Sequence, residues 1–88
     1  MRTIRLSGRE ASILKAIGFA EPMAGAEIQD LTRMELEDLG DTLNSLLAGG
    51  FIESIPCYEQ VDLAEVPVTS FEINPAYTRE LKDAIRNR

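Results

Sequence analysis

The stretch from Leu36 to Ile52, "LEDLGDTLNSLLAGGFI", restricts the fold more than any other part of the chain. Its leucines recur at spacings of three and four residues, which predicts an amphipathic helix with one apolar face. Two glycines follow, and glycine just past a helix end adopts a left-handed backbone without a Cβ clash. The stretch therefore predicts a helix, a tight turn and the start of a strand. The apolar face of the helix consists of Leu36, Leu39, Leu43, Leu46 and Leu47.

The N-terminal part predicts a short strand and a first helix. "TIRLS" alternates apolar and polar residues, which indicates a small edge strand from Thr3 to Leu6. "SGRE" is typical of a capping box, in which Ser7 accepts from the amide of Glu10 and Glu10 returns a bond to the amide of Ser7. Gly18 and Pro22 end the helix. Its apolar face is Ala11, Ile13, Leu14 and Ile17.

"AEIQDL" predicts a short second helix with Ile28 and Leu31 on its inner side. After the long third helix, "FIESIP" predicts a strand in which Phe51 and Ile55 alternate with polar residues, and "VTSFEI" predicts another. The apolar positions of the second strand are Val68, Phe71 and Ile73.

Two features complete the expected fold. Residues 57–67 are too many for a tight hairpin turn, so they form either an extended loop or lengthened strands. Asn74 suits the N-cap and Pro75 the first position of a closing helix. The apolar face of this helix is Tyr77, Leu81, Ala84 and Ile85. In a chain of 88 residues this face is expected to belong to the core, and a dimer interface is the alternative.

This order of elements resembles the winged helix-turn-helix superfamily. "AEIQDLTRMELEDLGDTLNSLLAGGFIES" is similar to the superfamily pattern, in which Leu43 and Leu46 are followed by Gly50 at the entrance to an apolar strand. The resemblance covers roughly residues 7–74. It implies an α+β fold, with a three-helix core, a two- or three-stranded antiparallel wing sheet and a C-terminal helix. The chain is then one domain, residues 1–88, with the helix-turn-helix at about 25–49, the wing at about 51–73 and the C-terminal helix at about 75–87.

In DNA-binding members of the superfamily the third helix enters the major groove and the wing touches the flanking backbone. Here the outward positions of that helix carry no base that could pair with guanine or hold a phosphate. The wing loop adds further acids, including Glu65, so DNA binding through the usual surface is disfavoured. The outward positions expected on the helix are Glu37, Gly40, Asp41, Asn44, Ser45 and Ala48. The candidate partner surface is Glu37, Asp41, Asn44, Ser45, Glu59 and Asp62.

The charge distribution supports this reading. The chain has a net charge of −6, yet residues 16–78 hold twelve acids against one base, whereas both ends are basic. Phosphate binding needs local positive charge, which the middle of the chain does not supply. The basic ends either aid solubility and complement the last helix dipole, or form a contact patch for nucleic acid or for an acidic face. The candidate basic contacts are Arg2, Arg5, Arg9, Arg33, Lys82 and Arg86.

The sequence offers few residues for catalysis, metal binding or phosphate binding. The chain has no His, and its single cysteine, Cys57, gives neither a zinc motif nor an intrachain disulfide. No glycine-rich phosphate loop is present, so neither an enzyme nor a bound cofactor or metal is expected. Cys57 is expected to be a half-buried wing residue in a protein of the reducing cytoplasm. No signal peptide is visible, and Lys15 interrupts the longest apolar stretch, so no membrane span is expected.

These observations favour a small, non-enzymatic regulatory or adaptor protein that works through protein contacts. Its partner is either a basic protein or a second copy, joined through the C-terminal helix. The alternative is a DNA-binding transcriptional regulator, and a third class is a structural fragment of a larger assembly.

Overall fold

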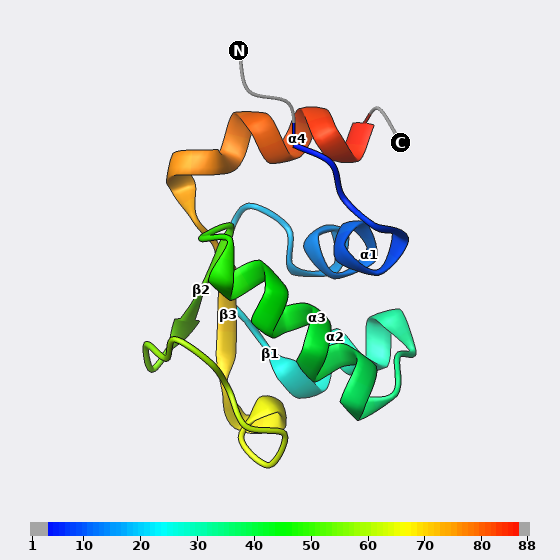
Figure 1. Ribbon diagram of the computed structural model, residues 1–88, viewed down its shortest axis with the longest axis vertical. Coiled ribbons are helices and arrows are strands. Elements are labelled where there is room, and N and C mark those ends of the chain that lie inside the picture. The colour runs from blue at the N-terminus through cyan, green and yellow to red at the C-terminus, as the bar shows by residue number, and fades with distance from the viewer. Residues whose placement is uncertain (1–3, 87–88) are drawn as a thin grey trace.

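Four α-helices and a three-stranded antiparallel sheet form the described part of the chain, residues 4–86, in the computed structural model (Figure 1). The α+β class predicted from the sequence is therefore confirmed. The elements are α1 (Gly8–Ile17), β1 (Met23–Ala24), α2 (Gly25–Thr32), α3 (Leu36–Ala48), β2 (Ile52–Ile55), the 3-10 turn η1 (Val66–Val68), β3 (Ser70–Ile73), the 3-10 turn η2 (Pro75–Tyr77) and α4 (Thr78–Arg86). None of the helices within this range is long and apolar enough to cross a membrane.

The sheet has β3 at its centre. β1 pairs with one edge of β3, with Met23 opposite Phe71, and β2 pairs with the other, with Ile52 opposite Ile73. Figure 1 shows the strands on one side of the molecule, α1, α2 and α3 on the other, and α4 lying across one end. The core lies between the sheet and these helices. Its fully buried side chains include Ile13, Leu14, Ile28, Leu39, Leu43, Leu46, Phe71 and Leu81.

The helix ends follow the sequence signals. Ser7 Oγ accepts from the Glu10 amide at 3.1 Å, and Glu10 Oε1 accepts from the Ser7 amide at 2.9 Å, so the predicted capping box is present. Gly18 and Gly50 have φ of 73° and 77°, the left-handed conformations that favour glycine. Asn74 caps the closing helix by accepting from the Ala76 amide. The first turn of this helix is the 3-10 turn η2 rather than α-helix.

The predicted strand from Thr3 to Leu6 is wrong. Thr3 lies outside the described residues, and Ile4–Leu6 form no strand. Instead β1, which the sequence pattern did not indicate, pairs with β3, so that edge of β3 is already occupied. Leu6 packs in the core without being part of the sheet.

The apolar faces of two elements also differ from prediction. In β2 the inward residues are Ile52 and Ser54, whereas Ile55 is exposed, because the strand begins one residue after Phe51 and the side chains alternate from there. On α2, Leu31 is 63% exposed, since the buried face of this helix runs through Gly25 and Ile28.

The segment between β2 and β3 contains two further differences. Val68 was predicted as an apolar strand position, but it lies in η1 and is 75% exposed. Cys57 is exposed rather than half-buried. Of the two alternatives for residues 57–67, the structure shows a long loop and not lengthened strands.

Candidate functional site

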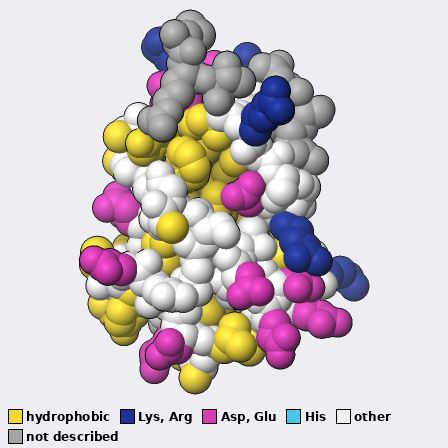
Figure 2. Space-filling view, viewed as in Figure 1, with side chains coloured by type: hydrophobic (Ala, Val, Ile, Leu, Met, Phe, Trp, Pro, Cys, Tyr) yellow, Lys and Arg dark blue, Asp and Glu magenta, His cyan; other side chains and the backbone are white. Residues whose placement is uncertain are grey.

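One narrow stripe of α3 faces solvent. Its members, hereafter the α3 stripe, are Glu37, Asp41, Ser45 and Ala48, spaced by four, four and three residues. They are exposed because the leucines occupy the opposite face of the helix. The α3 stripe carries two carboxylates and no base. Figure 2 shows acidic side chains gathered at the lower right of this view, over the first half of α3.

The loop at residues 56–69 covers the helix face beside this stripe. Asn44 Nδ2 donates to the carbonyl oxygen of Val61 at 3.1 Å, and the Val61 amide donates to Asn44 Oδ1 at 2.8 Å. One turn earlier Gly40 is buried, and a Cβ placed there would lie 2.5 Å from Leu63 Cδ2. Gly40 and Asn44 were both expected to point outward. The loop that covers them comes from a distant part of the chain, which helical spacing alone does not reveal.

The far part of the loop is fixed against α2. Val66 is buried, and its carbonyl oxygen lies where a Cβ on Gly25 would be. The Gly25 amide donates to the carbonyl oxygen of Thr69 at 2.8 Å, and Thr69 Oγ1 donates to that of Glu65 at 2.7 Å. The loop is therefore anchored at both α2 and α3 and is part of the folded domain.

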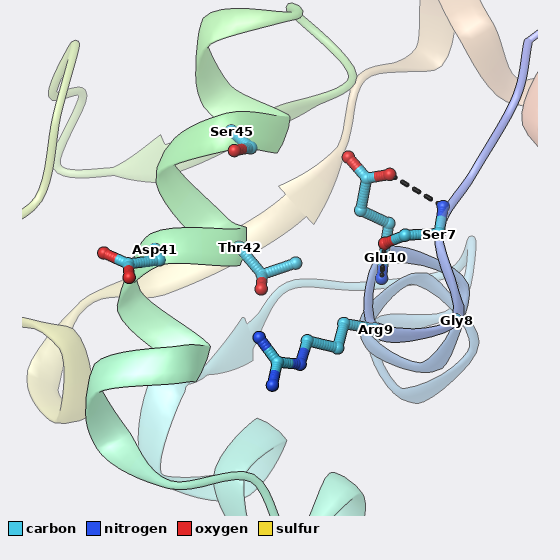
Figure 3. A pocket seen from close by; sticks show the side chains of 7 residues that line it. All are labelled: Ser7, Gly8, Arg9, Glu10, Asp41, Thr42 and Ser45. Carbon is cyan, nitrogen blue, oxygen red and sulfur yellow. Dashed lines mark hydrogen bonds between the residues drawn. The ribbon is translucent and has the colours of Figure 1, made fainter.

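Two hollows flank the α3 stripe. The loop-side hollow, about 500 Å³, is lined by Asp41, Asn44, Ser45, Ala48, Glu59 and Gln60. The helix-side hollow, about 620 Å³, lies between α3 and the start of α1 (Figure 3). Its lining is Ser7, Gly8, Arg9, Glu10, Asp41, Thr42 and Ser45. Asp41 and Ser45 thus form the ridge between the hollows.

The structure brings together four of the six residues predicted as a partner surface. Asp41, Asn44, Ser45 and Glu59 line the loop-side hollow. Glu37 lies at the N-terminal end of the α3 stripe. Asp62 is exposed on the loop, where its carbonyl oxygen accepts from the Glu65 and Val66 amides. The amide group of Asn44 is engaged by Val61, so this side chain positions the loop.

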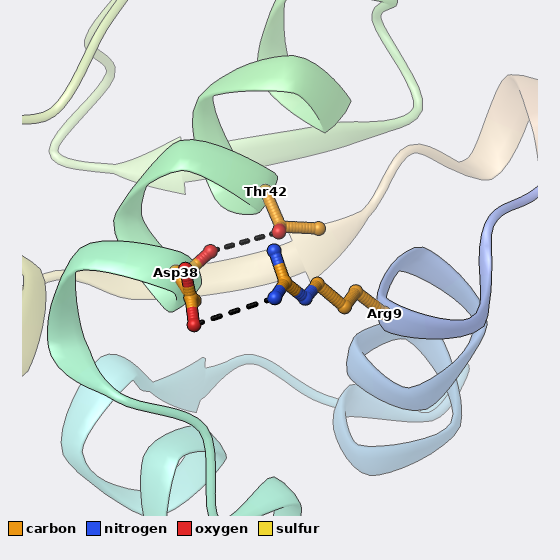
Figure 4. A network of polar contacts seen from close by, with 3 residues as sticks. All are labelled: Arg9, Asp38 and Thr42. Carbon is orange, nitrogen blue, oxygen red and sulfur yellow. Dashed lines mark hydrogen bonds and ion pairs between the residues drawn. The ribbon is translucent and has the colours of Figure 1, made fainter.

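Arg9 is a base that lines the helix-side hollow. Its Nη2 lies 3.4 Å from Asp38 Oδ2, and the Thr42 hydroxyl donates to the Asp38 carbonyl oxygen at 2.8 Å (Figure 4). Both charged side chains are well exposed, at 62% and 41%, so water and salt weaken their attraction. Arg9 therefore neutralises little of the acidic surface beyond Asp38.

Of the remaining predicted bases, Lys82 and Arg86 line one hollow on α4, and Arg33 lies at the end of α2. Arg2 lies outside the described residues, and Arg5 is exposed. Arg33 caps the C-terminus of α2 with a left-handed φ of 59°. Lys82 Nζ lies 5.1 Å from the centre of the Phe19 ring.

The expected basic patch is thus divided. Lys82 and Arg86 line a hollow on α4 together with Thr78, Arg79 and Asp83, while Arg9 faces α3. Phe19 is ten residues beyond Arg9 and follows the other end of α1, so the structure does not bring Arg9 and Lys82 together.

In the part of the chain that the structure describes, no three Cys, Asp or Glu side chains are grouped closely enough to hold a metal ion. The chain matches no family model, no curated protein and no solved structure. The function must therefore be inferred from the geometry of the α3 stripe and the loop beside it.

Proposed function

We propose that this chain is a non-enzymatic winged-helix module that acts through protein contacts, as an adaptor or a regulatory subunit. The order of helices and strands supports the winged-helix part of the proposal, with α2 and α3 as the helix-turn-helix and β2, the loop and β3 as the wing. Because winged-helix domains serve in several kinds of complex, the fold alone does not choose among their functions.

The observation that carries the proposal is the position of Asp41. It lies on the ridge of the α3 stripe and lines both hollows, with Glu59 contributing to one of them. A phosphate backbone approaching this helix would meet these carboxylates in a surface fixed by the Asn44–Val61 bonds. A protein carrying Lys or Arg would instead find complementary charge, which favours encounter and orientation.

A second candidate function, duplex DNA binding by a transcriptional regulator, draws on a different surface. Arg79, Lys82 and Arg86 line one hollow on α4, and bases gathered in this way could contact phosphates. In that case α4, rather than α3, would face the DNA.

The first experiment is titration of the purified chain against fluorescent random duplex DNA at two salt concentrations, with its mass in solution measured alongside. The proposal expects no binding even at low salt, where phosphate contacts are strongest. Micromolar binding that falls steeply with salt would instead support the DNA-binding regulator, with Lys82 and Arg86 as the next residues to change.

A charge reversal tests the protein-contact surface directly. Asp41→Lys should weaken the capture of a basic partner from an extract of the source cells, whereas stronger binding to DNA would mean that DNA approaches α3. Asp30→Lys is the matched control, because Asp30 is an exposed helical acid on α2 that lines neither hollow. Equal loss of capture in both variants would contradict a role for the α3 stripe.

A further inference from the structure

Four large apolar side chains stand exposed on residues 55–68, which run from the last residue of β2 to the turn before β3. They are Ile55, Tyr58, Leu63 and Val68, with 47%, 38%, 41% and 75% of their surface exposed. Within residues 4–86 the other exposed large apolar residues are Phe19 and Leu31. Scattered apolar residues are ordinary on a protein surface, whereas a group of them marks a contact site. We call these four residues the apolar loop surface.

The backbone beneath this surface is held in place. Ser54 Oγ donates to the Pro56 carbonyl oxygen at 2.9 Å and accepts from the Tyr58 amide at 2.7 Å. The middle of the loop is bound to α3 through Asn44 and Val61. The four side chains are therefore presented by a fixed backbone, which lowers the entropic cost of binding.

Pairing in the sheet places the two ends of the segment close together. Ile55 lies opposite Ser70 in the ladder, and Val68 precedes Ser70 by two residues. Figure 2 shows hydrophobic side chains at the lower left and at the bottom of the molecule, where Figure 1 draws this segment, with acidic side chains between them.

The charge of this region determines which partner it fits. Glu59, Asp62 and Glu65 are interleaved with the apolar residues, and residues 34–78 hold nine acids and no base. An anionic membrane or a nucleic acid would be repelled. A protein segment that combines apolar side chains with Lys or Arg would satisfy both features of the surface.

We propose that the apolar loop surface is the docking site for a partner segment in which apolar residues are interspersed with Lys and Arg. This inference rests on the proposed function and names the chemistry of the partner. A second copy of the chain fits less well, because α4 does not offer bases and apolar side chains on the same surface. The bases of α4 lie on its exposed side, whereas its apolar residues, Leu81 and Ile85, pack toward the core.

The test uses a fluorescent amphipathic peptide of lysine and leucine, with a lysine and serine peptide of the same length and charge as the control. Binding to the full chain is followed by anisotropy, and the contact is mapped by amide chemical shifts. We expect the lysine and leucine peptide to bind at least about tenfold more tightly and to shift amides in residues 55–68. Equal binding of the two peptides would overturn the proposal, because only charge would then be recognised.

Variants make the test specific. The double variant Ile55→Thr with Val68→Thr keeps both side chains β-branched but replaces apolar surface with hydroxyl groups, and it should weaken peptide binding by about tenfold or more. Leu31→Gln is the matched control, because it removes an exposed apolar side chain from α2 and should change affinity by less than about twofold. Thermal unfolding of each variant confirms that it is folded, and equal affinity of the double variant and the wild type would refute the docking site.

Two further outcomes separate this inference from the proposed function. If the peptide shifts amides of the α3 stripe alone, the protein-contact function stands and the apolar docking site falls. If the wild type is a dimer that the double variant converts to a monomer, a second copy occupies the surface and the inference is wrong. If neither peptide binds, the docking site is rejected, and the proposed function is still judged by the Asp41→Lys comparison.

Discussion

Asn44 and Val61, seventeen residues apart, are joined by two hydrogen bonds in which one side-chain amide serves both the carbonyl oxygen and the N–H of one backbone residue. The pair connects the outer side of α3 to the middle of the β2–β3 loop. Val61 is 3% exposed, so water cannot readily replace either bond. The β2–β3 loop and the outer side of α3 therefore form one continuous surface.

Removal of this amide should destabilise the protein. Asn44→Ala leaves the buried N–H and carbonyl groups of Val61 without their partner, and we expect a loss of about 2 kcal/mol in the free energy of unfolding. Urea denaturation measures this loss. Ser45→Ala, at the exposed neighbouring position, should change the value by less than about 0.5 kcal/mol. A similar small effect at Asn44 would show that the loop does not depend on these bonds.

Two glycines under the loop should respond differently to alanine. In Gly25→Ala the new Cβ meets the backbone carbonyl of Val66, which can move only if the loop moves, so we expect a loss of about 3 kcal/mol. In Gly40→Ala the Cβ meets the end of the Leu63 side chain, which can rotate, and alanine favours the helix by about 1 kcal/mol. Its net effect should be within about 1 kcal/mol of zero. Denaturant midpoints compare the two variants, and a larger loss at Gly40 would mean that Leu63 is rigidly held.

The helices were the most predictable part of this chain. The leucine pattern of α3, the Ser7 capping box and the Asn74 cap depend on residues within a few positions of one another, so the sequence alone contains the information. The strands were harder. β1 has only two residues, and its pairing with β3 joins segments almost fifty residues apart, which no local pattern reports.

The candidate site was predictable in its chemistry but not in its shape. The acids of α3 and the loop are visible in the sequence, and the structure gathers Asp41 and Glu59 around one hollow. That the loop covers Gly40 and engages Asn44 depends on long-range packing. The exposure of Val68 was missed for the same reason, since its β-branched side chain resembles that of a strand residue until η1 is seen.

Two isoleucines of β2 can be used to test which face of this strand points into the core. Ile52 is 2% exposed and Ile55 is 47% exposed, although the sequence pattern places Ile55 on the apolar face together with Phe51. Ile52→Ala should lower the free energy of unfolding by about 3 kcal/mol because it leaves a cavity in the core. Ile55→Ala should cost less than about 1 kcal/mol. Equal losses in chemical denaturation would place both side chains in the core and contradict the described register.

Two variants at the start of α1 compare the stabilisation from a helix cap with the stabilisation from a surface ion pair. Ser7→Ala removes the acceptor of the Glu10 amide, and we expect a loss of about 1 kcal/mol. Arg9→Gln removes the 3.4 Å pair with Asp38 but keeps a good helix former, and the exposure of both partners limits its cost to about 0.5 kcal/mol or less. Thermal unfolding at low and at high salt distinguishes the two, since only the Arg9 contribution should decrease with salt. A salt-dependent loss in Ser7→Ala would mean that charge, rather than the capping hydrogen bond, fixes this end of the helix beside the acidic surface of α3.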